Sequence, residues 1–289
     1  MTLLTELPAW LSLPPGRSSS PEAVIAAPFA LPVIQAMAAQ QAPATGMVAL
    51  FTTGAAPALL GEHPCLYLDP NPLPLLALTL QLHGPTPAQI ASALSRLLAQ
   101  PYRGRPWGQY LQSLYLTSCP ACWRPAMVQD YRWQGAPPTL IAKQVRCDFC
   151  DFQGETHADA DDQARAAEVA PGPSLRWEML ARVAPVEDPL RARVEQALGF
   201  YTPRNLWGLW QTLRILDETE LSREERRALQ WLLAIALWQG SSLAGQDDLL
   251  WQAALRRPRR FRERNLWLLL HEALEQVQQQ TGRVGHARG

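Results

Sequence analysis

The chain has 289 residues and carries 26 lysines and arginines against 26 aspartates and glutamates, so its formal net charge is zero. Hydrophobic residues make up 47% of the chain and charged residues only 18%, which excludes wholesale disorder and supplies enough apolar surface for about two domains. The neutral balance excludes a uniformly basic nucleic-acid coat protein, although local basic patches remain compatible with it.

Residues 1–100 are poor in charge and alternate strand-like with helix-like segments. Short apolar runs at 47–51 and 65–68 predict strands, and the apolar spacing over 87–100 predicts an amphipathic helix. This alternation is typical of an α/β unit with parallel strands. The first strand leads into a small-residue turn containing Gly54, and the second ends at Asp69, as in nucleotide-binding units where an acidic side chain binds the ribose. We therefore predict Gly54 and Asp69 as cofactor-binding residues. The alternative is that Asp69 only caps the end of the strand.

Residues 101–157 contain two Cys-X-X-Cys pairs, formed by Cys119, Cys122, Cys147 and Cys150. Each pair can supply two thiolates from one tight turn, and four thiolates complete the tetrahedral shell of Zn²⁺. Strand-like stretches lie between the pairs, so the sequence predicts a zinc ribbon. The ribbon is either a structural staple or a nucleic-acid-binding surface. The second interpretation uses its cations, which are Arg124, Arg132, Lys143 and Arg146.

Residues 158–200 form an acidic, proline-containing linker with a short predicted helix, and residues 201–289 are predicted to form a helical bundle. Thr202 as N-cap and Pro203 at the first helical position predict the start of one of its helices. A basic run lies near the end of the chain. Like charges this close together repel, so the run favours a phosphate-bearing partner, with a solvated linker the alternative. The candidate nucleic-acid ligands in the run are Arg256, Arg257, Arg259, Arg260 and Arg262.

Three segments resemble one protein family in the order in which they occur. Leu68–Leu73 is similar to "(I/V)DxNPL", Phe200–Leu206 to "FTPRNL", and Pro258–Trp267 to "P.RF.ERN.W". These segments, with the ribbon between the first two, resemble the bacterial DNA methyltransferases that methylate adenine or cytosine-N4 amino groups and carry an inserted zinc ribbon. The resemblance spans roughly residues 20–275. It implies a partial Rossmann-like unit, an inserted zinc ribbon and a C-terminal helical region, with S-adenosylmethionine as cofactor and DNA as substrate.

Two departures from the family pattern bear on activity. Thr53 and Ala55 replace the glycines that make room for S-adenosylmethionine, and the chain contains no Asp/Asn-Pro-Pro-Tyr/Phe motif to grip a flipped base. The resemblance therefore implies a DNA-binding, methyltransferase-like pseudoenzyme that is inactive alone and pairs with a separately encoded catalytic subunit. The alternatives are an active methyltransferase with an unorthodox site around Asp69, and a protein-interaction adaptor.

Cellular location follows from two further observations. Residues 1–15 lack the basic start of a signal peptide, and no apolar run reaches the roughly 18 residues of a membrane-spanning helix. We expect a cytoplasmic protein with no membrane partner.

Overall fold

The computed structural model describes residues 48–50, 65–67, 72–168, 173–244 and 256–286. The chain divides into two compact units. The first comprises residues 1–87, 223–231 and 277–289, and the second comprises residues 88–222 and 232–276. The structure is 54% helical and 19% strand, which confirms the mixed helix-and-sheet class expected from the sequence. Membership of the Rossmann-like class stays a prediction.

The first unit contains the parallel strand pair that the sequence predicts. Strands β1 (Val48–Leu50) and β2 (Cys65–Tyr67) pair with Val48 opposite Cys65, and helix α4 (Pro72–His83) follows them. Gly54 and Asp69 lie outside the described residues, so their roles stay predictions.

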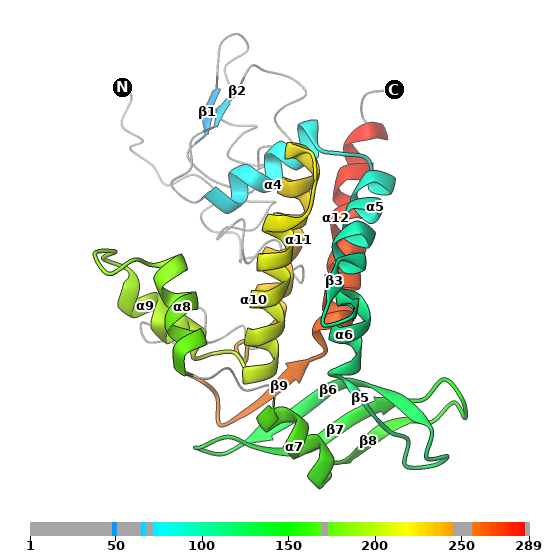
Figure 1. The fold of residues 1–289 in the computed structure, drawn as a ribbon. Helices are drawn as coiled ribbons and strands as arrows, with labels where there is room; N and C mark the ends of the chain where they lie inside the picture. The colour runs from blue at the N-terminus through cyan, green and yellow to red at the C-terminus, as the bar shows by residue number, and fades with distance from the viewer. Residues whose placement is uncertain (1–47, 51–64, 68–71, 169–172, 245–255, 287–289) are drawn as a thin grey trace, which may run out of the picture. The chain divides into compact units, whose positions relative to one another are not determined.

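An antiparallel sheet organises the second unit (Figure 1). Its strands, in the order in which they pair, are β5 (Leu116–Ser118), β6 (Pro125–Gln134), β7 (Thr139–Arg146) and β8 (Gln153–His157). A fifth strand, β9 (Arg260–Arg264), pairs with the Asp130–Gln134 half of β6, whereas β5 pairs with its Pro125–Met127 half. Since β7 occupies the other side of β6, strands β5 and β9 follow one another along the same edge.

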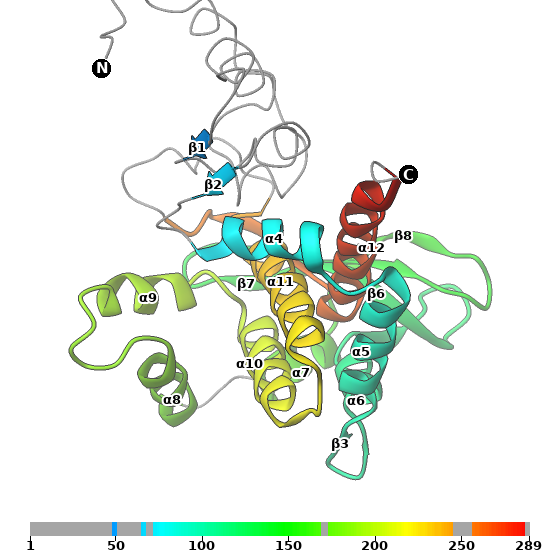
Figure 2. The same cartoon turned by 90° about the horizontal axis from the view of Figure 1, so that it is seen from above.

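Helices precede β5, lie between β8 and β9, and follow β9 along the chain. Figures 1 and 2 show α6, α10 and α12 on one side of the sheet. The described helices beyond α4 are α5 (Pro87–Ala99), α6 (Trp107–Ser113), α7 (Ala160–Glu168), α8 (Pro173–Val183), α9 (Arg191–Leu198), α10 (Pro203–Glu218), α11 (Arg223–Gly240) and α12 (Leu266–His286). A short β-hairpin joins α5 to α6. Its strands are β3 (Pro101–Tyr102) and β4 (Arg105–Pro106), and a two-residue turn connects them. No helix among the described residues is both long enough and apolar enough to cross a membrane.

Helix α10 begins where the sequence predicts. The Thr202 side chain accepts a hydrogen bond from the Asn205 backbone N–H, which satisfies one of the unpaired donors of the first turn. Leu206 and Trp210 then face Met179 of α8 in one buried cluster. The apolar spacing of α10 therefore serves the packing of the second unit.

The organisation of residues 158–289 differs from the prediction in two respects. The acidic stretch expected to be a linker carries helices α7, α8 and α9. The basic run expected within a helical bundle or linker forms strand β9, because its residues alternate between exposed Arg260 and Arg262 and buried Phe261 and Glu263. That period of two suits an edge strand with one buried face. Residues 101–157 therefore do not complete their sheet alone.

Candidate metal centre and basic surfaces

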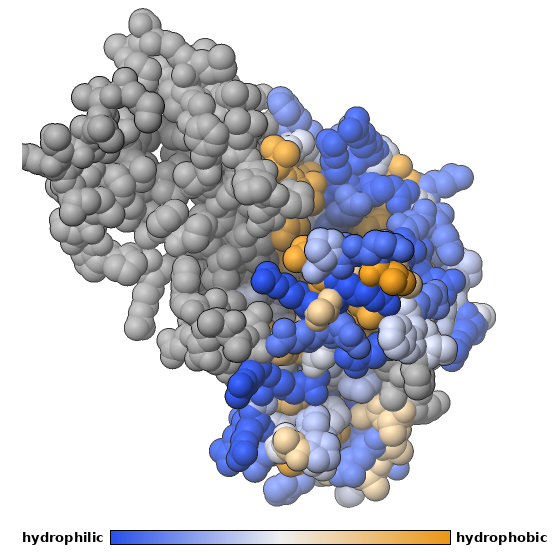
Figure 3. Space-filling view, turned by 90° about the vertical axis from the view of Figure 1, so that its left-hand side faces the viewer, coloured by the Kyte–Doolittle hydropathy of each residue, from blue (hydrophilic) through white to orange (hydrophobic). Residues whose placement is uncertain are grey.

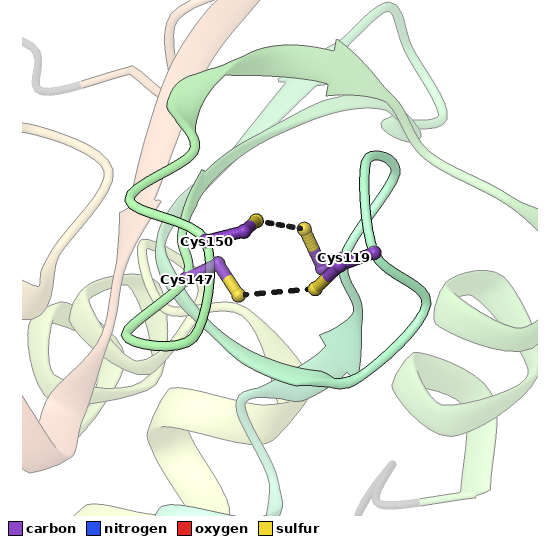
Figure 4. Close-up of side chains that lie close together, drawn as sticks. Cys119, Cys147 and Cys150 are labelled. Atoms are coloured by element: carbon purple, nitrogen blue, oxygen red, sulfur yellow. Dashed lines mark hydrogen bonds between the residues drawn. The ribbon is translucent and has the colours of Figure 1, made fainter.

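The four paired cysteines converge at one end of the sheet (Figure 4). Their Sγ atoms all lie within 4.8 Å of one another, with 3.6 Å between those of Cys119 and Cys150 and 3.6 Å between those of Cys122 and Cys147. Sulfur ligands about 2.3 Å from a tetrahedral metal ion are separated by about 3.8 Å along each edge. The thiols thus have the spacing of a metal site, and the cluster could hold a metal ion.

Each cysteine pair lies on a tight turn fixed by backbone hydrogen bonds. In the first turn the Cys119 N–H donates to the Arg124 carbonyl at 2.8 Å, and the Trp123 N–H donates to the Cys119 carbonyl at 2.9 Å. In the second, the Cys147 N–H donates to the Phe152 carbonyl at 2.9 Å. Trp123 and Asp151, each directly after the second cysteine of its pair, have positive φ angles of 63° and 55°. We call these two matching turns the knuckles.

Two thiols of the cluster have pKa values that are shifted in opposite directions. Burial raises the pKa of Cys119, but backbone N–H groups of Cys122 and Ala121 outweigh it and lower that pKa to about 7. The Phe152 N–H lowers the pKa of Cys150, yet burial and the neighbouring thiols raise it to about 12. The Cys119 thiol therefore loses its proton readily, whereas the Cys150 thiol keeps its proton. This is expected for acidic groups that lie close together without a counter-charge.

The knuckles also expose large aromatic side chains. Trp123 on the first knuckle is 80% exposed, and Phe149 on the second is 60% exposed. The Arg124 guanidinium lies 5.1 Å from the centre of the Phe149 ring, in cation–π contact that links the two turns. The sequence analysis included Arg124 but did not identify Phe149 or predict the contact between these two side chains.

The other ribbon cations are paired with acidic side chains. Arg132 contacts Glu155 at 2.9 Å, and Arg146 contacts Asp148 at 3.6 Å. Both arginines are partly exposed, so these ion pairs are weak and can rearrange.

Lys143 does not lie on the surface, which corrects the expectation that it contacts nucleic acid. Its Nζ donates to Thr117 Oγ1 at 2.7 Å, to Asp159 Oδ2 at 2.7 Å, and to the buried Asp162 carboxylate of α7. An ammonium group has three donors, and all three are used here. Lys143 therefore joins β7 to α7 and has no donor left for a phosphate.

The arginines of the basic run near the end of the chain differ in whether they have polar partners within the protein. Arg257 donates to the backbone carbonyls of Gly199 and Tyr201, and Arg262 Nη2 contacts Asp130 Oδ2 at 2.6 Å. Arg256, Arg259 and Arg260 are exposed, and among the described residues their guanidinium groups contact no acidic side chain. The Arg262 side chain is exposed as well, but Asp130 competes with an external anion for its guanidinium group.

A buried polar cluster, which the sequence analysis missed, joins the start of α10 to β9. Arg204 is 1% exposed and its Nε lies 3.3 Å from Oε1 of the fully buried Glu263. The Arg204 guanidinium also lies 4.2 Å from the centre of the Tyr131 ring and donates to the Leu114 carbonyl at 3.0 Å. The cluster fixes α10 against β6 and β9.

Two asparagines complete this connection. Asn205 Nδ2 donates to the backbone carbonyls of Gly240 and Arg264, each at 3.1 Å, and accepts from the Tyr115 hydroxyl at 2.6 Å. Asn265 Nδ2 donates to the Val128 carbonyl at 2.7 Å, while its Oδ1 accepts from the backbone N–H of Trp267 at 2.9 Å. The repeated Arg-Asn-Leu-Trp at 204–207 and 264–267 is the sequence signal for this cluster, since each copy contributes a buried asparagine.

Comparisons with known proteins add no assignment. No protein-family model matches the chain, no curated protein matches it, and no solved structure matches it.

Proposed function

We propose that the metal held by the four cysteines is Zn²⁺. The donor set is sulfur only, the sulfur spacing suits a tetrahedral ion, and all four positions are filled by protein, which is the pattern of structural zinc sites. Ala126 and Val145 supply the small core around the cysteines, so the metal would provide much of the local folding energy.

Metal analysis of the purified full-length chain tests this assignment. We expect about one zinc per chain, and less than half of that in a Cys150→Ser variant. A sulfur-rich site loaded with iron instead would show absorbance in the visible range and would contradict the zinc assignment. Recovery of metal-free, folded wild-type protein would contradict a structural metal site altogether.

We further propose that the chain binds nucleic acid, with DNA as the class that the family resemblance favours. The observation that carries this proposal is the exposed Trp123 and Phe149 on adjoining knuckles, with the Arg124 guanidinium over the Phe149 ring. Exposed rings on a rigid turn can stack with unpaired bases, and each stacked base contributes about 1–3 kcal/mol. A neighbouring arginine adds a phosphate contact or a further stacking plane.

The rest of the charged surface is consistent with this mode of binding. Arg256, Arg259 and Arg260 are exposed at the start of β9 and supply cations for a phosphate backbone. The ion pairs Arg132–Glu155 and Arg262–Asp130 limit the net charge of the sheet. We therefore expect moderate affinity for nucleic acid, with base stacking as the main contribution to the binding free energy.

Fluorescence anisotropy with a labelled single-stranded DNA oligonucleotide tests the proposal. Trp123→Ala and Phe149→Ala should each weaken binding roughly tenfold or more, from the loss of about 1–3 kcal/mol of stacking. Trp177→Ala removes an equally large exposed ring from α8 and serves as the matched control. Wild-type protein that does not bind DNA, or knuckle variants that bind as tightly as wild type, would refute the knuckle surface.

The family resemblance suggests a biological setting for this binding. We propose that the chain is the non-catalytic, DNA-binding partner of a separately encoded methyltransferase subunit. Calorimetry with S-adenosylmethionine separates this proposal from an active enzyme with an unorthodox site around Asp69. Binding heat that disappears in Asp69→Ala would support the active enzyme, whereas absence of heat and of a thermal shift at millimolar cofactor would support the non-catalytic role.

A protein-binding adaptor is the second candidate function, favoured by one surface. Helices α8 and α9 and their connection expose four large apolar side chains, Trp177, Val183, Val186 and Leu190. Figure 3 views the side where these helices lie in Figure 1, and apolar side chains interrupt its hydrophilic surface in small patches. If a catalytic subunit binds there, Trp177→Ala with Val186→Ser should weaken its binding without changing zinc content or DNA affinity.

A further inference from the structure

The hairpin between β3 and β4 presents two arginines on a rigid turn. Its tip residues Arg103 and Gly104 have φ angles of 48° and 79°, the combination of a type I′ turn. A Cβ added to Gly104 would contact nothing within 4 Å, although its backbone conformation disfavours any other residue. Figure 2 shows the β3 hairpin extending away from α5 and α6. The tip is therefore shaped by local sequence and open to solvent.

Both arginines of the hairpin are held beside one tyrosine ring. The Arg105 guanidinium lies 4.6 Å from the centre of the Tyr110 ring, and that of Arg103 lies 5.7 Å from it. Arg105 Nη2 donates to Ser113 Oγ at 3.0 Å, and Arg103 Nη1 donates to the Tyr110 hydroxyl at 3.4 Å. These contacts restrict two side chains that would otherwise lose much rotamer freedom on binding a ligand.

The tyrosine is itself fixed by a cluster of rings. Tyr110 packs edge-on against Tyr102 with 4.9 Å between ring centres, and stacks on the fully buried Trp107 at 6.0 Å. Trp107 in turn donates from Nε1 to Thr212 Oγ1 of α10 at 3.3 Å. The two guanidinium groups are thus anchored through Tyr110 to the core of the second unit.

Positive charge accumulates at this hairpin without a compensating acid. Within the described part of the chain, Arg103 and Arg105 make hydrogen bonds only to uncharged hydroxyl oxygens and form no ion pair with a carboxylate. A third exposed arginine, Arg214 of α10, lies close enough that its charge, like that of Arg103, opposes the rise that burial causes in the pKa of Tyr102. Like charges held together are destabilising unless an anion binds between them.

We propose that Arg103 and Arg105 form a binding site for the phosphate groups of a nucleic-acid backbone. The inference rests on the proposed nucleic-acid function and adds to it a contact that lies outside the cysteine ribbon and the basic run. Guanidinium forks match phosphate oxygens in geometry, and an adjacent pair suits a polymer that carries a charge at every nucleotide. The site reads no sequence and serves to position the strand.

The test compares oligonucleotide affinity over a range of salt concentrations for full-length wild-type and variant proteins. Arg103→Gln/Arg105→Gln should lower the slope of log K against log salt by about 1.4 for single-stranded DNA, and should weaken binding roughly tenfold to thirtyfold near 0.1 M salt. Arg103→Lys/Arg105→Lys keeps both charges and should retain the slope. Arg193→Gln removes an exposed charge from α9 and should leave both slope and affinity close to wild type. Melting temperatures of all variants are measured to confirm that they fold.

The outcomes distinguish this inference from the function on which it rests. If wild-type protein binds no oligonucleotide, the nucleic-acid function fails and this site fails with it. If Trp123→Ala weakens binding but the double glutamine variant does not, the knuckle surface stands and the hairpin site is overturned. Inorganic phosphate, added at constant ionic strength, provides a second arm. A phosphate-dependent thermal shift that the double variant loses, together with unchanged DNA binding, would assign the site to a small phosphate compound and overturn the backbone contact.

Discussion

Replacing Glu263 by glutamine tests whether the Arg204–Glu263 pair stabilises the second unit. Glutamine keeps the size of the side chain and can still accept the hydrogen bond that Trp133 Nε1 donates to Glu263 Oε2 at 2.7 Å. It removes the only carboxylate that contacts Arg204 among the described residues. Burial lowers the pKa of Arg204, but Glu263 and the nearby tyrosines outweigh it and raise that pKa above its usual value, so the guanidinium stays charged. The variant would contain an unpaired, buried cation.

The magnitude follows from the burial of both partners. Breaking a buried ion pair by neutralising one partner costs about 3–5 kcal/mol, because the remaining charge is left without compensation. The Tyr131 ring and the Leu114 carbonyl recover part of this cost, so we expect a loss of about 3 kcal/mol in the free energy of unfolding. Arg204→Met should cost a similar amount. The double variant should be more stable than the sum of the two losses predicts, by about 2–3 kcal/mol.

Urea unfolding followed by circular dichroism measures these free energies. Unfolding of a chain with two compact units need not be two-state, so amide hydrogen exchange of β6 and β9 is measured as well. Hydrogen exchange reports local opening where the ion pair lies. Glu178→Gln on the exposed surface of α8 is the matched control and should change stability by less than about 0.5 kcal/mol. A Glu263→Gln variant within about 1 kcal/mol of wild type, or strictly additive losses in the double variant, would refute the reasoning.

Three further predictions concern the polar contacts around the sheet. Lys143→Met should lower the free energy of unfolding by about 2–4 kcal/mol, because it leaves the buried Asp162 carboxylate without its ammonium partner, while anisotropy should show unchanged DNA affinity. Burial raises the pKa of Asp159, but donors from Lys143 and the Asp162 backbone lower it below its ordinary value of 3.8. The contribution of the Asp159 carboxylate to the free energy of unfolding is therefore complete above about pH 4, and it is lost as the pH falls through the lowered pKa. Urea midpoints between about pH 4 and pH 2 should thus fall more steeply for wild type than for Asp159→Asn, and equal slopes would contradict the assignment. Asn265→Ala should lower the free energy of unfolding in urea by about 2–3 kcal/mol, because it removes the N-cap of α12 and a donor to a β6 carbonyl. A loss below about 0.5 kcal/mol would show that water replaces both hydrogen bonds.

The features that the sequence predicts well have short-range causes. The two Cys-X-X-Cys pairs bring their thiols together because each pair occupies one turn, and only a short two-stranded connection separates the pairs. Thr202 and Pro203 determine the start of α10 through contacts within one helical turn. Alternating apolar residues along β6 and β7 likewise indicate strands before their partners are known.

The missed features depend on partners that are distant in sequence. Charged residues are rarely fully buried, so nothing local distinguishes Arg204, Glu263 or Lys143 from solvent-exposed cations and acids. The basic run was interpreted through its charge, as a phosphate-binding segment or a solvated linker, because three of the five residues of β9 are arginine. Its strand pattern becomes informative only once Tyr131 and Trp133 of β6 are placed opposite it. The sequence analysis did not identify Arg103 and Arg105 of the hairpin as candidate ligands for a different reason. Their arrangement depends on the ring of Tyr110 and is not marked by a sequence motif.

The position of β9 has a consequence for how the chain folds as it is synthesised. Strand β6 ends at Gln134, but its partner along the Asp130–Gln134 edge does not exist until the ribosome has passed Arg264. At about 5–20 residues per second, the nascent sheet keeps an open edge for roughly ten seconds, and Arg204 emerges well before its carboxylate. An unpaired strand edge of this kind is prone to association with other chains. The last of the four cysteines, Cys150, is synthesised long before Arg264, so early binding of metal would hold β6 and β7 together until the last strand arrives.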